Sequence, residues 1–183
     1  GHIPVFECMV KHNWDINYSL DHRGDALICA LKFHAPELAR WLLEHGADPN
    51  ANLGSDPLAG TALEVACSAR CPRDIISLLI HKGADIEGSI SMLVAAWVGH
   101  NEALSILLDG GADIDTIPKA SSSDLLLEEY WGTPLHGAAA KGQSETVRFL
   151  LNKGARKDIL NNAGRTPIET AEHFGHVACA SIL

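Results

Sequence analysis

An internal repeat constrains the fold of this chain more than any other feature of its sequence. The tripeptide Gly-Ala-Asp begins at Gly46, Gly83 and Gly111, and a variant, Gly-Ala-Arg, begins at Gly154. These starting points are 37, 28 and 43 residues apart, and each is closely preceded by an apolar pair: Leu42-Leu43, Leu79-Ile80, Leu107-Leu108 and Leu150-Leu151. Self-similarity at a spacing of about 20–50 residues is typical of proteins built from small stacked repeats.

A second pattern, rich in alanine, lies between these markers and is clearest over residues 133–139. Thr133 is placed to cap the start of a helix, and Pro134 occupies the first helical position, where no amide donor is lost. Thr166 and Pro167 repeat this arrangement. A second helix is predicted over residues 144–152, because its apolar side chains fall on one stripe at helical spacing.

Helices shorter than about 12 residues are marginal in isolation, and one such pair cannot bury its own apolar stripe. The pairs are therefore expected to stack, so that each is stabilised by its neighbours. The run Thr-Pro-Leu-His-Gly-Ala at residues 133–138 matches the signature of ankyrin repeats, and the chain resembles that family over nearly its whole length. The resemblance implies an all-α ankyrin-repeat solenoid of stacked helix-turn-helix units with β-turn fingers. It also implies structural hydrogen bonds between loops for His100, His136 and His176.

The expected array is a single domain over residues 1–183, with five to six repeats that are incomplete at both ends. Full repeats are expected at 18–51, 52–87, 88–115 and 130–161, partial repeats at 1–17 and 162–183, and an insertion at 116–129. Because the array begins and ends inside a repeat, we expect the chain to be a fragment of a larger protein.

Composition argues against several classes of partner. The chain has 23 Asp and Glu residues against 14 Lys and Arg residues, a net charge of −9, whereas nucleic-acid binders and proteins of anionic membrane surfaces need a basic face. We therefore expect no nucleic acid and no membrane, and a neutral or basic protein partner. The five cysteines are irregularly spaced and mostly lie in apolar stretches, so we interpret them as reduced core thiols. Reduced thiols predict an intracellular location, cytoplasmic or nuclear.

No nucleotide-binding loop, hydrolase elbow or metalloprotease motif is present in the sequence, so neither enzymatic activity nor a cofactor is predicted. Two sets of side chains could be interpreted as zinc ligands: Cys67 and Cys71 with His81, and His173 and His176 with Cys179. Structural zinc requires four convergent ligands. We expect Cys67 to pack within the first helix of its repeat, Cys71 to lie in the following loop, and Cys179 to face the core. We therefore predict no metal site.

In the ankyrin family, partners usually lie in a concave groove lined by the fingers and by the exposed ends of the first helices. By register, the resemblance places eight candidate partner-binding residues there: Phe33, Trp97, Val98, Trp131, Lys141, Arg165, His173 and Phe174. The aromatic members are expected to face solvent, and aromatic anchors of this kind dominate many interfaces. Trp97 and Trp131 are the preferred anchors. The alternative is that the insertion folds back over Trp97 and shields it.

The predicted function is non-catalytic binding of a partner protein or peptide. One alternative is an intramolecular docking platform for another domain of the same protein, which the full-length sequence would reveal. A second alternative is a small-molecule enzyme whose pocket is roofed by residues 116–131 and lined by Glu128, Glu129, His136 and Lys141. No catalytic constellation in the sequence supports this second alternative.

Overall fold

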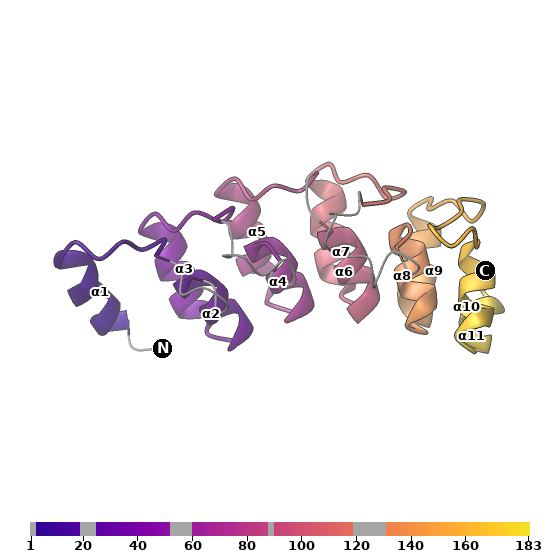
Figure 1. Cartoon of the computed structure of the whole chain (residues 1–183), viewed down its shortest axis with the longest axis horizontal. Coiled ribbons are helices and arrows are strands. Elements are labelled where there is room, and N and C mark those ends of the chain that lie inside the picture. The colour runs from indigo at the N-terminus through magenta and orange to yellow at the C-terminus, as the bar shows by residue number, and fades with distance from the viewer. Residues whose placement is uncertain (1–2, 19–24, 52–59, 88–89, 119–130) are drawn as a thin grey trace. The chain divides into compact units, whose positions relative to one another are not determined.

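The computed structural model (Figure 1) describes residues 3–18, 25–51, 60–87, 90–118 and 131–183. It contains two compact units. The N-terminal unit is Gly1–Asp85 and the C-terminal unit is Ile86–Leu183. All regular secondary structure in the described ranges is helical, which confirms the predicted all-α fold. The predicted insertion lies outside the described residues from residue 119 onward.

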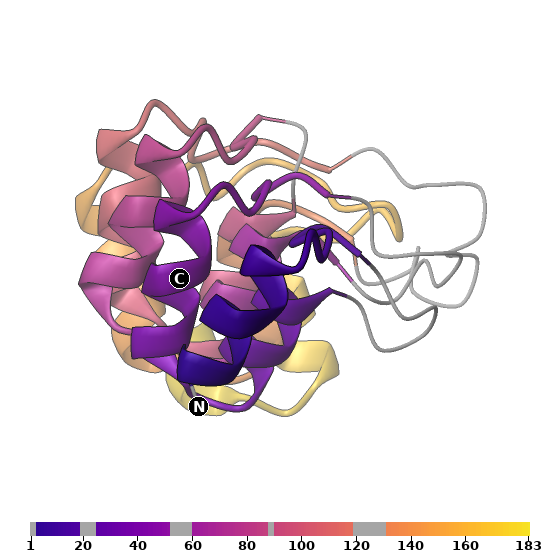
Figure 2. The same cartoon turned by 90° about the vertical axis from the view of Figure 1, so that its left-hand side faces the viewer.

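The N-terminal unit contains α1 (Ile3–Lys11) and two helix pairs. The pairs are α2 (Ala26–Lys32) with α3 (Pro36–Glu44), and α4 (Ala62–Ser68) with α5 (Arg73–His81). Within each pair the helices pack together, and between the pairs α2 packs on α4 and α3 on α5, so that first and second helices form two rows (Figure 2). Leucine and isoleucine side chains with exposed fractions of 1% or less fill the space between the rows: Leu27, Ile28, Leu42, Leu43, Leu63, Ile75, Ile76 and Leu79.

The C-terminal unit repeats this arrangement with three pairs. The first helices, α6 (Ser91–Val98), α8 (Pro134–Ala140) and α10 (Pro167–His173), pack in a row with α8 in the middle. Each packs on its own second helix, and these are α7 (Asn101–Asp109), α9 (Ser144–Asn152) and α11 (Val177–Ala180). The prediction of a helix over residues 144–152 is confirmed by α9.

The predicted helix starts at Thr133 and Thr166 are also confirmed, with Pro134 and Pro167 in the first turn. The Thr166 backbone N–H donates to Glu169 Oε2 at 2.7 Å, and the Glu169 N–H donates back to Thr166 Oγ1 at 3.3 Å. This reciprocal capping satisfies amide donors that the first turn leaves unpaired. At the start of α8 the imidazole of His136 takes the place of the glutamate.

Aromatic side chains link α1 to α3 in the N-terminal unit. The ring of Phe6 lies 5.8 Å from that of Trp14 and 6.4 Å from that of Trp41, and His45 stacks on Trp41 at 3.9 Å. Trp14 and Trp41 are half-buried in this cluster. Their role is therefore packing between helices.

Candidate functional site

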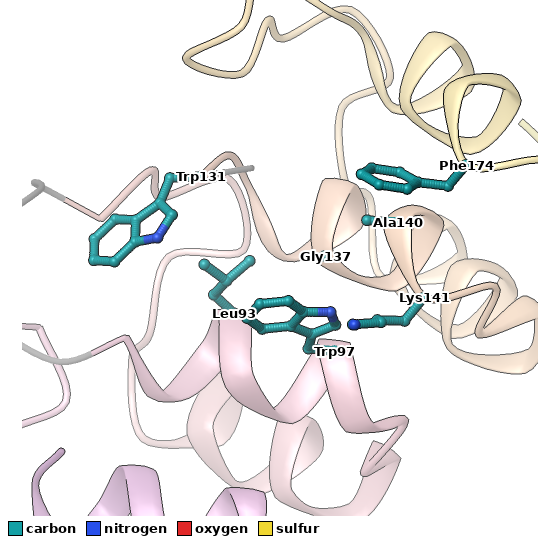
Figure 3. A pocket seen from close by; sticks show the side chains of 7 residues that line it. All are labelled: Leu93, Trp97, Trp131, Gly137, Ala140, Lys141 and Phe174. Atoms are coloured by element: carbon teal, nitrogen blue, oxygen red, sulfur yellow. The ribbon is translucent and has the colours of Figure 1, made fainter. Parts of the chain in front are cut away.

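A pocket of about 320 Å³ lies on the C-terminal unit, along α6 and α8 and beside the C-terminal end of α10 (Figure 3). We call it the Trp97 pocket. It contains one charged side chain, and the rest of its described lining is apolar: Leu93, Trp97, Trp131, Gly137, Ala140, Lys141 and Phe174.

One wall of the pocket depends on a close approach of α6 to α8. Leu93 and Trp97 are one helical turn apart, so their side chains share a face of α6. A Cβ atom at Gly137 of α8 would lie 2.7 Å from Leu93 Cδ1 and 3.3 Å from the Leu93 carbonyl oxygen. Glycine at this position is therefore what lets α8 approach α6 closely enough to make one wall.

Lys141 and Trp97 form a cation–π contact at one end of the pocket. Lys141 Nζ lies 4.8 Å from the centroid of the Trp97 ring, and Figure 3 shows the lysine directed at the indole. The position of Trp97 is fixed through its carbonyl oxygen, which accepts a hydrogen bond from Gln143 Nε2 at 3.1 Å. The indole Nε1 is buried and has no hydrogen-bond partner among the described residues.

Trp131 and Phe174 provide the other walls. Trp131 is only 7% exposed, which differs from the solvent-facing position expected of it. Its carbonyl oxygen accepts a hydrogen bond from the Asn162 backbone N–H at 2.9 Å. This bond holds the segment that precedes α8 against the loop between α9 and α10. Phe174, at the end of α10, is half-buried, and its ring meets that of His173 edge-on at 4.9 Å.

The pocket unites four of the eight predicted binding residues: Trp97, Trp131, Lys141 and Phe174. Val98, Arg165 and His173 belong to the same unit but do not line it. Phe33, at the end of α2 in the N-terminal unit, is 79% exposed. Leu93 and Gly137 line the pocket but are not among the predicted residues, although the four-residue spacing from Leu93 to Trp97 indicates the first.

Comparison with known proteins identifies the fold family. A family model of ankyrin repeats in three copies matches residues 92–183, and a single ankyrin repeat model matches residues 25–52. The chain belongs to the ankyrin repeat family. Ankyrin repeats are generally non-catalytic modules that mediate protein–protein interaction.

Curated relatives of this ankyrin chain are much longer proteins. It is 35% identical over 112 residues to human ankyrin repeat and KH domain-containing protein 1, a match that covers 58% of this chain and 4% of that protein. It is 37% identical over 83 residues to inversin of Danio rerio, covering 45% and 7%. It is 28% identical over 170 residues to neurogenic locus notch homolog protein 1 of Mus musculus, covering 90% and 6%. The chain thus spans less than a tenth of each of these relatives.

The histidine of the ankyrin signature, His136, has a structural role. The Thr133 backbone N–H donates to His136 Nδ1 at 3.1 Å, so Nδ1 is the acceptor and Nε2 carries the proton. Nε2 then donates to the carbonyl oxygen of Arg165 at 3.0 Å. Burial lowers the pKa of His136, which keeps the ring neutral. Similarly, His176 Nε2 lies 3.1 Å from the carbonyl oxygen of Ala140. Both histidines thus make structural hydrogen bonds to a neighbouring repeat, but each bond joins α8 to a loop or turn and not two loops.

Neither of the two sets of side chains considered as zinc ligands forms a metal-binding cluster in the part of the chain that the structure describes. No group of three or more metal-ligating side chains converges within the described ranges. All five cysteines are free thiols. In the same part of the chain no helix is both long and apolar enough to cross a bilayer. Glu128 and Glu129, considered for an enzymatic pocket, lie outside the described residues.

Proposed function

We propose that this ankyrin chain is a non-catalytic interaction module that binds a partner protein or peptide at the Trp97 pocket. The observation that carries the proposal is the grouping of Trp97, Phe174 and the exposed Lys141 around one apolar pocket. Tryptophan is enriched among the residues that dominate interfaces, and apolar pockets with a few polar groups are the usual form of binding sites.

Three further features support the proposal. Phe33 is 79% exposed in the N-terminal unit, which is a high value for a large apolar ring and makes it a second candidate contact. The net charge of −9 favours a partner that is neutral or basic as a whole, and argues against nucleic acid. The free thiols support a reducing location, in the cytoplasm or nucleus.

The test is selection of random linear peptides displayed on phage against the whole chain. Variants Trp97→Ala and Phe174→Ala should lose most of the selected binders while keeping the helical circular dichroism of the parent. The matched control is Phe149→Ala, because Phe149 is also half-buried in the C-terminal unit and also lies under a lysine, Lys153 at 5.9 Å, but is not part of the pocket.

Binders that survive Trp97→Ala but not Phe149→Ala would contradict the proposed site. Failure to select any peptide that depends on the pocket would contradict the proposed function. Trp131→Ala is less informative, because Trp131 is 7% exposed and its truncation removes core packing.

A further inference from the structure

We propose that the Trp97 pocket selects a partner segment in which an acidic residue stands next to a large apolar residue. This inference rests on the proposed function and specifies the chemistry of the ligand. Its basis is the distribution of polar groups in the pocket, where every polar side-chain group among the described lining residues is a hydrogen-bond donor.

The charged group of the pocket is a cation without a matching anion. Lys141 forms no ion pair among the described residues, and its ammonium group lies over the Trp97 ring. No carboxylate is among the described residues that line the pocket. An ammonium group has three donors and no acceptor, so a carboxylate is the ligand group that complements it best.

The second donor is the Trp97 indole N–H, which is buried and unpaired in the described part of the chain. A buried donor without a partner is unfavourable, so supplying an acceptor would recover free energy. Because Lys141 is directed at the same indole (Figure 3), a carboxylate that binds the ammonium group is held beside the Trp97 ring.

The rest of the pocket lining is apolar, and the pocket is large enough for a bulky side chain. Leu93, Trp131, Ala140 and Phe174 offer carbon surface to such a side chain. A volume of about 320 Å³ exceeds the roughly 150 Å³ that holds a benzene-sized group in protein interiors. A leucine or aromatic side chain therefore fits with room for part of the adjoining residue, which brings the two required groups close together in the ligand.

The net charge of the chain does not oppose this local preference. The value of −9 acts over the whole molecule and influences the approach of a partner, whereas contacts inside a pocket depend on the groups that line it. A partner that is neutral or basic overall can carry a short acidic and apolar segment.

The experiment compares phage-displayed peptides selected by the parent chain with those selected by Lys141→Gln. The parent should enrich peptides with Asp or Glu beside Leu, Phe or Trp, and Lys141→Gln should lose the acidic enrichment while keeping the apolar one. Lys153→Gln is the matched control, since Lys153 also lies over an aromatic ring in this unit and is not part of the pocket. It should select the same peptides as the parent.

A selected peptide is then titrated beside its Asp→Asn or Glu→Gln analogue. The amide analogue should bind the parent about tenfold more weakly and bind Lys141→Gln with a loss of about twofold or less. Equal losses in both chains would overturn the inference. So would peptides that depend on Trp97 but show no acidic enrichment, and that result would leave the proposed function standing. Absence of any peptide that depends on Trp97 would overturn both.

Discussion

The side-chain amide of Asn50 binds the backbone on both sides of Ala84, one repeat further along the chain. Asn50 Oδ1 accepts from the Asp85 backbone N–H at 2.8 Å, and Asn50 Nδ2 donates to the Gly83 carbonyl oxygen at 2.7 Å. Asn17 Oδ1 accepts from the Asp48 N–H at 2.8 Å in the same way. The two asparagine side chains therefore link successive loops of the N-terminal unit and hold those loops in place.

Replacing Asn50 should therefore destabilise the N-terminal unit. Asn50→Ala removes two hydrogen bonds and should lower the free energy of unfolding by about 1–2 kcal/mol. Asn50→Asp keeps the acceptor and loses the donor, so its effect should be smaller. Urea denaturation followed by circular dichroism measures both. If the alanine variant were as stable as the parent, the loops would be held by other contacts.

The aspartate variant has a natural counterpart in the C-terminal unit. There Asp115 Oδ1 accepts from the Arg156 backbone N–H at 3.0 Å, and a carboxylate has no N–H for the second bond. Asp115→Asn adds that donor and should not destabilise the chain. This substitution serves as the control for Asn50→Asp in the same denaturation experiment.

A second prediction concerns the turns between paired helices. In the C-terminal unit glycines with positive φ occupy these turns, as at Gly175 with φ of 74°, whereas His34 adopts φ of 52° between α2 and α3. A left-handed conformation costs a non-glycine residue about 1–2 kcal/mol, and glycine loses up to about 1 kcal/mol of that advantage through its freer unfolded chain. His34→Gly should therefore raise stability by about 0.5–1 kcal/mol, measured by thermal denaturation.

Gly175→Ala is the reciprocal test. A Cβ atom at Gly175 would meet nothing within 4 Å, so only the backbone conformation is changed. Stability should fall by about 1 kcal/mol. Stabilisation by His34→Gly without any cost at Gly175→Ala would mean that φ is not the cause.

The sequence predicts the helices of this family better than it predicts their contacts. The sequence predicts Thr133, Thr166 and the helix over residues 144–152 because capping and apolar spacing are local signals. It does not indicate His34 as a left-handed turn residue, because histidine does not carry the signal that glycine does. The burial of Trp131 depends on how neighbouring segments meet around it, and residues 133–138 alone do not specify that.

The third prediction follows from the lowered pKa of His136. When burial holds the folded-state pKa below the ordinary value of 6.5, the unfolded chain binds the proton more tightly. The neutral ring therefore contributes its full stability above pH 6.5, and that contribution falls as the pH drops toward the folded-state pKa. The free energy of unfolding of the parent should decline more steeply below pH 6.5 than that of His136→Gln, which has no titrating group here.

The chain contains ten histidines, so only this difference between parent and variant reports on His136. At neutral pH, His136→Gln should cost about 1–3 kcal/mol, because it disturbs the hydrogen bonds to Thr133 and Arg165. If the pH profiles of parent and variant were parallel, His136 would have the same pKa in the folded and in the unfolded chain.

The last prediction uses cysteine reactivity to follow opening of the two units separately. Burial raises the pKa of the Cys67 thiol to about 12, and its side chain is 0% exposed within α4. The reactive thiolate is therefore scarce and inaccessible, whereas Cys8 is exposed.

Iodoacetamide should label Cys8 rapidly in the folded chain, and mass spectrometry of peptides should detect label on Cys67 only when the N-terminal unit opens. Cys179, buried in the C-terminal unit, is the internal reference. Asn50→Ala should accelerate labelling of Cys67 and leave Cys179 unchanged, whereas equal acceleration at both thiols would show that the two units open together.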